Sequence, residues 1–160
     1  MSDAALVGAP VLLPLAAAVL VFAGGPRGRR GVTAGLCAGL ALAAALLAIA
    51  VWQRGTITHH AGGWVPPLGI MLRADGLAAL MVIMNTAVGI AVSVFATGYF
   101  GPSPHGPGGG HPTDSELFWP LWFMLWGALN ALFLSGDVFN LYVTLELVGL
   151  SGVGLISLAG

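Results

Sequence analysis

Five long apolar runs constrain this chain more than any other feature of its sequence. They cover residues 6–23, 32–52, 76–97, 117–135 and 138–158. A helix needs about 20 predominantly apolar residues to cross the hydrocarbon core of a bilayer. The run at 32–52 shows no alternation of polar and apolar positions, which a transmembrane β-strand would require. The runs therefore predict an all-α membrane protein with five transmembrane helices.

Composition supports the same class. Of the 160 residues, 58% are hydrophobic and 7% are charged, whereas soluble chains carry about 25% charged residues. The formal net charge of −1 argues against a nucleic-acid-binding protein, which would present a basic face. The opening residues, MSDAA, lack the basic region of a signal peptide. We therefore expect the first apolar run to be retained as a helix in a lipid bilayer.

The arginines predict an orientation. Three of the five, Arg27, Arg29 and Arg30, lie in the short loop between the first two predicted helices. The other two, Arg54 and Arg73, flank the next loop on the opposite side. Positive charge in short loops favours the cytoplasmic side. This predicts an N-terminus outside the cell and a cytoplasmic C-terminus.

The connecting segments differ in kind. Residues 53–75 carry strand-type residues around a Gly-Gly and a Pro-Pro, which predicts a small extracytoplasmic hairpin at about 57–72. Residues 101–112 contain five glycines and four prolines, a composition typical of a flexible connector. Only Gly-Asp separates the last two runs, so we expect their helices to be antiparallel neighbours.

Small residues recur at helical spacing in two runs. Gly31, Gly35 and Gly39 stand four residues apart in the second run, and Gly127 and Ala131 do so in the fourth. Such rows let membrane helices approach closely. They also arise by chance in helices rich in alanine and glycine.

Glu146 is the polar residue that most needs an explanation. Among the eleven charged side chains, it alone falls well inside a predicted transmembrane helix. An ionised acid at that depth costs about 2.5–3.5 kcal/mol on insertion scales, and such residues are components of proton relays by default. The alternative is a protonated glutamate that is buried between helices only for packing.

Three asparagines lie inside predicted helices. Asn130 is expected at a depth similar to that of Glu146, so the two could interact directly or through a water. Asn140 lies nearer the membrane surface, and Asn85 is central in the third run. For each asparagine, a hydrogen bond between helices is the main interpretation.

The remaining polar residues are two aspartates at helix starts and four histidines in loops. Asp75 and Asp137 each stand immediately before a predicted helix, where a carboxylate caps free backbone amides. His59 and His60 are adjacent, and the four histidines show no spacing typical of a zinc site. We therefore predict neither a metal site nor a cofactor.

Two stretches resemble a known family. They read GGWVPPLGIMLRADGLAALM at 62–81 and ALFLSGDVFNLYVTLELVGLSGVGL at 131–155. Both resemble the antiporter-like subunits of Mrp-type cation/proton antiporters, the D-type subunit in particular. The same superfamily includes membrane-arm subunits of respiratory complex I and of membrane-bound hydrogenases.

The resemblance implies a transporter subunit rather than an enzyme, in the cell (inner) membrane and assembled with other subunits. Glu146 would be the family's membrane-buried glutamate in the proton path, and Asp137, Asn140 and Asp75 belong to the shared motifs. Family members have about fourteen helices and a lysine on the seventh, whereas this chain has no lysine. We therefore expect either a split subunit or a fragment, and favour the N-terminal part of a longer subunit, with one membrane domain at 1–160.

Three functions remain open on the sequence. The first is proton exchange for sodium or another monovalent cation. The second is proton pumping in the membrane arm of a complex I-like NADH-quinone oxidoreductase or hydrogenase. The third is a structural module that only packs helices.

Overall fold

The computed structural model describes residues 2–24, 28–64, 69–100 and 112–158. Its elements are α1 (Asp3–Gly24), α2 (Arg29–Arg54), β1 (Ile57–His60), a 3-10 turn (Ala61–Gly63), β2 (Met71–Ala74), α3 (Gly76–Tyr99), α4 (Pro112–Phe133) and α5 (Val138–Ser157). The all-α class and the five predicted helices are confirmed. The largest shifts are at three starts, since α1 begins at Asp3 rather than 6, α2 at Arg29 rather than 32 and α4 at Pro112 rather than 117.

Four of the helices, α1, α2, α3 and α5, are long and apolar enough to cross a membrane. The fourth helix, α4, carries Trp119, Trp122, Pro120 and Asn130, which lower its hydropathy. This helix packs against α1, α3 and α5, so less of its surface is left for contact with lipid. A central helix needs less apolar surface than one that faces lipid. The predicted orientation across the membrane stays a prediction.

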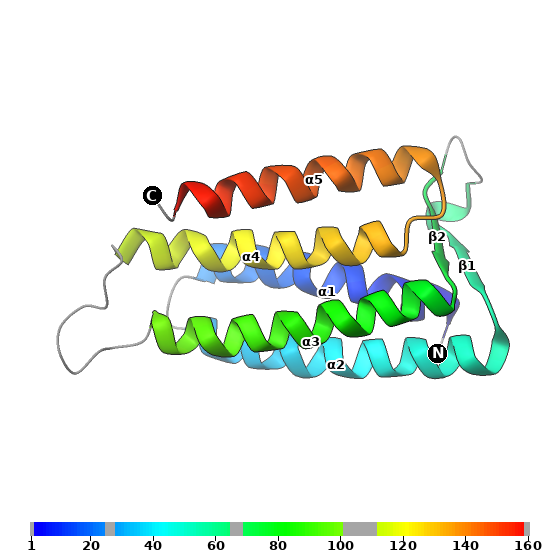
Figure 1. Ribbon diagram of the computed structural model, residues 1–160, viewed down its shortest axis with the longest axis horizontal. Coiled ribbons are helices and arrows are strands. Elements are labelled where there is room, and N and C mark those ends of the chain that lie inside the picture. The colour runs from blue at the N-terminus through cyan, green and yellow to red at the C-terminus, as the bar shows by residue number, and fades with distance from the viewer. Residues whose placement is uncertain (1, 25–27, 65–68, 101–111, 159–160) are drawn as a thin grey trace.

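The helices lie side by side, roughly parallel to one another, with their ends staggered (Figure 1). The helix α2 packs against α1 and α3, and α5 packs against α4 on the opposite side of the bundle. The predicted pairing of the last two helices is confirmed, although their link is the four residues 134–137 rather than two. The hairpin covers the end of the bundle where α3 and α5 begin (Figure 1).

The predicted hairpin is also confirmed. The strands β1 and β2 pair antiparallel, with Ile57 opposite Ala74 and His60 opposite Met71. Gly62 follows at a φ of 73°, a backbone conformation that glycine adopts without the strain of a Cβ atom. Residues 65–68 of this segment, and most of the connector predicted at 101–112, lie outside the described residues.

The close helix contacts are not where the strongest glycine row predicted them. A Cβ atom added at Gly31 or Gly35 would meet nothing within 4 Å, whereas one at Gly39 would lie 3.6 Å from the Leu13 side chain of α1, so within this row only Gly39 lies at a helix contact. By contrast, a Cβ at Gly127 would lie 3.0 Å from the Leu15 side chain, and one at Gly89 would collide with the Trp126 ring. The tight contacts therefore join α4 to α1 and to α3.

Candidate functional site

The two motif stretches meet in space at the hairpin end of the bundle. The Arg73 N–H donates to the carbonyl of Leu134 at 2.8 Å, and the Gly136 N–H donates to the carbonyl of Met71 at 2.8 Å. The link between α4 and α5 thus pairs with β2 through a single antiparallel bridge, between Leu72 and Ser135. A Cβ atom at Gly136 would lie 3.0 Å from the Met71 carbonyl oxygen, so glycine allows this close approach.

Asp137 ties this junction to α5. One carboxylate oxygen accepts from the Asn140 N–H at 2.7 Å and caps the helix, and the other accepts from the Met71 N–H at 2.8 Å. Asp75 caps α3 by accepting from the Ala78 N–H at 2.9 Å. The predicted capping roles of both aspartates are confirmed. Asp137 in addition fixes the start of α5 relative to the hairpin, a role that sequence reasoning missed.

Two asparagines, of which one is fully buried and one half-buried, form a polar connection across three helices. Asn130 is fully buried, and its Nδ2 donates to the carbonyl of Pro10 at 2.8 Å. Its Oδ1 accepts from Asn85 Nδ2 at 2.8 Å. The predicted interhelical hydrogen bonds of Asn85 and Asn130 are confirmed, and they join α1, α3 and α4.

The Pro10 carbonyl needs this partner for a reason that is visible in the sequence. In a helix, the carbonyl of residue 10 accepts from the N–H of residue 14. Here residue 14 is a proline, which has no N–H to donate. Asn130 replaces that missing donor from a neighbouring helix, so α1 accommodates Pro14 without leaving the Pro10 carbonyl unpaired.

The buried face of α5 carries Asn140, Thr144 and Ser151. Thr144 donates to the carbonyl of Asn140 at 2.9 Å, and Ser151 donates to that of Leu147 at 2.7 Å. The side-chain nitrogen of Asn140 is buried and has no hydrogen-bond partner among the described residues. The interhelical bond predicted for Asn140 is therefore not made by this side chain.

For Glu146, the structure contradicts part of what the sequence predicted. It is the ninth of the 20 residues of α5, about 2 Å from the helix midpoint, so its central depth agrees with the expectation. Its side chain, however, is exposed, and no hydrogen bond or ion pair reaches it from the described residues. The expected burial is wrong within this chain.

The reason is the angle around the helix. At about 100° per residue, Glu146 lies about 200° beyond Thr144, on the side of α5 that faces away from α4. Asn130 points instead toward α1 and α3, so the expected interaction between Asn130 and Glu146 is not formed. Apolar side chains surround Glu146 on this outer face of α5: Phe139, Tyr142, Leu150 and Val153 are all more than 60% exposed.

Comparison with known proteins adds the family. No protein-family model matches the chain. The chain is 31% identical over 157 residues to the D-type subunit of the Na(+)/H(+) antiporter of Alkalihalophilus pseudofirmus. The aligned region covers 97% of this chain and 30% of that protein. It is 32% identical over 151 residues to the N-type subunit of the NADH-quinone oxidoreductase of Desulforudis audaxviator, covering 94% of this chain and 29% of that protein.

The fold is found in a solved structure as well. The Mrp complex from Dietzia sp. contains a chain that superimposes with a TM-score of 0.76 at 23% identity, over 96% of this chain and 27% of that one. These similarities confirm the resemblance carried by the two motif stretches. The chain is therefore a homologue of the D-type antiporter and N-type oxidoreductase subunits of these membrane complexes, and it spans about 30% of the length of the relatives it matches.

Proposed function

We propose that this chain is part of a proton-translocating subunit in a multisubunit monovalent cation/proton antiporter of the cell (inner) membrane. Its motif stretches and its similarity to a D-type antiporter subunit support this assignment. Protons and a monovalent cation, with sodium the first candidate, are the transported species. The chain's partners are the other subunits of the complex and the surrounding lipid.

One observation carries the proposal, namely the depth of Glu146 on an outer helix. An ionised carboxylate near the middle of a transmembrane helix costs about 2.5–3.5 kcal/mol. The described residues offer Glu146 no polar partner that would offset this cost. Such a residue is retained when it takes up and releases protons, and a partner must then come from outside this five-helix bundle.

The outer face of α5 has room for that partner. Only 17% of the most apolar stretch of α5 is buried within the chain, against 33–44% for α1, α2 and α3. We propose that further helices of the assembled complex cover this face and bring a cationic or polar group to Glu146. Proton uptake at Glu146 then depends on the charge of that group.

The other predicted site residues have supporting roles in this scheme. Asp137 holds the start of α5 against the hairpin, and Asn140 stands at the first turn of the same helix. Together they set the depth of Glu146. Asn130 and Asn85 join α4, against which α5 packs, to α1 and α3, and Asp75 caps α3.

The test replaces Glu146 in the assembled complex. Glu146→Gln keeps the size of the side chain and removes its charge and its proton exchange. In proteoliposomes that contain a pH-sensitive dye, we expect cation-driven proton movement to fall to the level of empty vesicles. Glu146→Asp, which retains a carboxyl group, should restore part of the activity. The composition of the purified complex confirms that each variant assembles.

Glu116→Gln is the matched control, because Glu116 is the chain's other glutamate and lies exposed near the start of α4. It should leave exchange unchanged. Full exchange by Glu146→Gln would refute the relay role, and only a structural role of the helix bundle would then remain for this chain.

A second function has support of its own. The similarity to an N-type subunit of an NADH-quinone oxidoreductase is as strong in identity as that to the antiporter subunit. In that case Glu146 would relay protons in a redox-driven complex. Purification of the native complex separates the two, since co-purifying iron–sulfur subunits indicate the redox complex and further antiporter subunits indicate the exchanger.

A further inference from the structure

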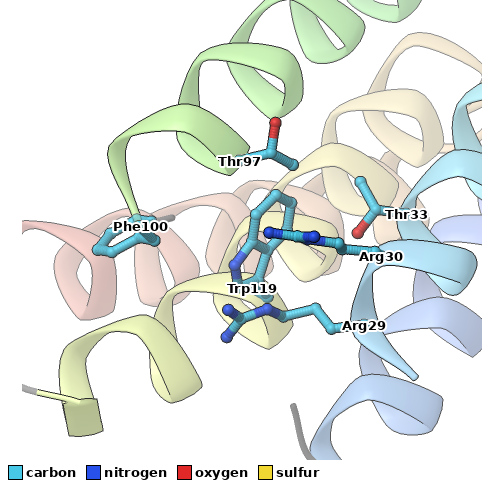
Figure 2. A pocket seen from close by; sticks show the side chains of 6 residues that line it. All are labelled: Arg29, Arg30, Thr33, Thr97, Phe100 and Trp119. Carbon is cyan, nitrogen blue, oxygen red and sulfur yellow. The ribbon is translucent and has the colours of Figure 1, made fainter. Parts of the chain in front are cut away.

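A small cavity lies between the ends of α2, α3 and α4, far from Glu146 and from the hairpin. Its volume is about 20 Å³, and it is lined by Arg29, Arg30, Thr33, Thr97, Phe100 and Trp119 (Figure 2). This volume holds one oxygen-sized group. The cavity therefore has room for one water molecule or for a single oxygen atom of a larger ligand.

Two buried polar groups at the cavity have no partner among the described residues. Thr33 is 5% exposed and Trp119 is 1% exposed, yet Thr33 Oγ1 and Trp119 Nε1 accept or donate no hydrogen bond. Buried polar atoms are nearly always paired, because an unmade hydrogen bond costs about 1–3 kcal/mol. Both groups can donate, so a ligand that satisfies them must be an acceptor.

Positive charge surrounds the same cavity. The guanidinium groups of Arg29 and Arg30 point toward Trp119 (Figure 2), and the Arg29 carbon Cζ lies 5.7 Å from the centre of the Trp119 ring. Glu116 interacts with the charge of Arg29, which leaves Arg30 as the net positive charge among these three. The ligand is therefore expected to be an anion.

The start of α2 adds to the positive electrostatic potential at the cavity. Gly28 provides no side-chain cap, and the first turn of α2 has no acidic residue. The positive end of the helix dipole and its free N–H groups are thus not compensated by the helix's own side chains. An acceptor anion at this end gains from both.

We propose that this cavity binds the phosphate of an anionic phospholipid, whose oxygens accept from Thr33 Oγ1 and Trp119 Nε1 and whose charge lies on Arg30. The location favours a lipid over a free anion, because the cavity lies at the ends of apolar membrane-spanning helices and is lined by Phe100 and Trp119. Aromatic and basic residues are typical of the level of the headgroups.

The test measures lipid retention by native mass spectrometry of the assembled complex, exchanged into nanodiscs of phosphatidylcholine mixed with phosphatidylglycerol. Thr33→Val keeps the side-chain shape and removes the orphan hydroxyl. We expect it to weaken phosphatidylglycerol retention about tenfold, the effect of losing one hydrogen bond to a charged group. Arg30→Gln should weaken it at least as much.

The matched control is Thr97→Val. Thr97 lines the same cavity, but its hydroxyl already donates to the Val94 carbonyl at 2.7 Å, so retention should not change. If Thr33 has only a structural role, Thr33→Val will leave phosphatidylglycerol retention unchanged. The stability of the protein will then be equal or higher, because an unpaired buried hydroxyl has been removed. That result would overturn the proposal.

Inorganic phosphate distinguishes the source of the anion. The lipid site predicts that free phosphate does not displace bound phosphatidylglycerol. Displacement by phosphate, or equal retention of phosphatidylcholine and phosphatidylglycerol, would show that no anionic lipid is selected here.

Discussion

Replacing Asn130 by leucine tests the polar connection that joins three helices. Leucine has the same branching and the same number of side-chain heavy atoms as asparagine, so the change removes hydrogen bonds without opening a cavity. Asn130 is 0% exposed and makes two interhelical hydrogen bonds, each of 2.8 Å, to Asn85 and to the Pro10 carbonyl. In a membrane, the added apolar atoms bring no compensating gain, since lipid is as apolar as leucine.

The expected loss follows from these contacts. Interhelical hydrogen bonds in membrane proteins contribute about 0.6 kcal/mol on average, so two contribute about 1.2 kcal/mol. The substitution also strands the Pro10 carbonyl, which costs about 1–3 kcal/mol. We expect Asn130→Leu to lower the free energy of unfolding by about 2–4 kcal/mol. Asn85→Leu removes one of these bonds and keeps the Pro10 carbonyl paired, but it leaves the buried Asn130 Oδ1 without its donor, so its cost should be smaller by only the second hydrogen bond, about 0.6 kcal/mol.

Pro14→Ala provides the diagnostic rescue. Alanine at 14 restores an N–H that can donate to the Pro10 carbonyl within α1, as in a regular helix. In the Pro14→Ala background, Asn130→Leu should therefore cost about 1–2 kcal/mol less than it does alone. The free energy of unfolding is measured by sodium dodecyl sulfate titration in mixed micelles, followed by circular dichroism. The four proteins compared are the unsubstituted protein, Asn130→Leu, Pro14→Ala and the double variant. An equal cost of Asn130→Leu in both backgrounds would refute the assigned role of the Pro10 carbonyl.

The same unfolding assay tests the junction and the helix contacts. Asp137→Ala should cost about 1–2 kcal/mol for its cap alone and more in total than Asp75→Ala, because only Asp137 also accepts from the Met71 N–H; equal costs would argue against the link to the hairpin. Gly89→Ala should destabilise by about 1–3 kcal/mol because its Cβ collides with the Trp126 ring. Gly35→Ala, with nothing within 4 Å, should be neutral or stabilising, and a loss there would show a helix contact outside this bundle.

Local chemistry made much of the site predictable. Asp75 and Asp137 precede helices, and a carboxylate in that position can reach the amides of the first turn whatever the rest of the fold does. The pairing of Asn130 with Pro10 was not predictable in the same way. Pro14 indicates a stranded carbonyl at residue 10, but the donor comes from a residue 120 positions away, which only the packing of α4 on α1 brings near.

The apolar runs by themselves determined the class and the helix count, because a backbone in lipid must satisfy its hydrogen bonds within each segment and a helix does so. They also determined the depth of Glu146, since the rise per residue is constant along a helix. The direction in which Glu146 points was decided only by the tertiary structure. Which side of α5 meets α4 depends on how the Asn140, Thr144 and Ser151 face packs, and that choice turns Glu146 outward.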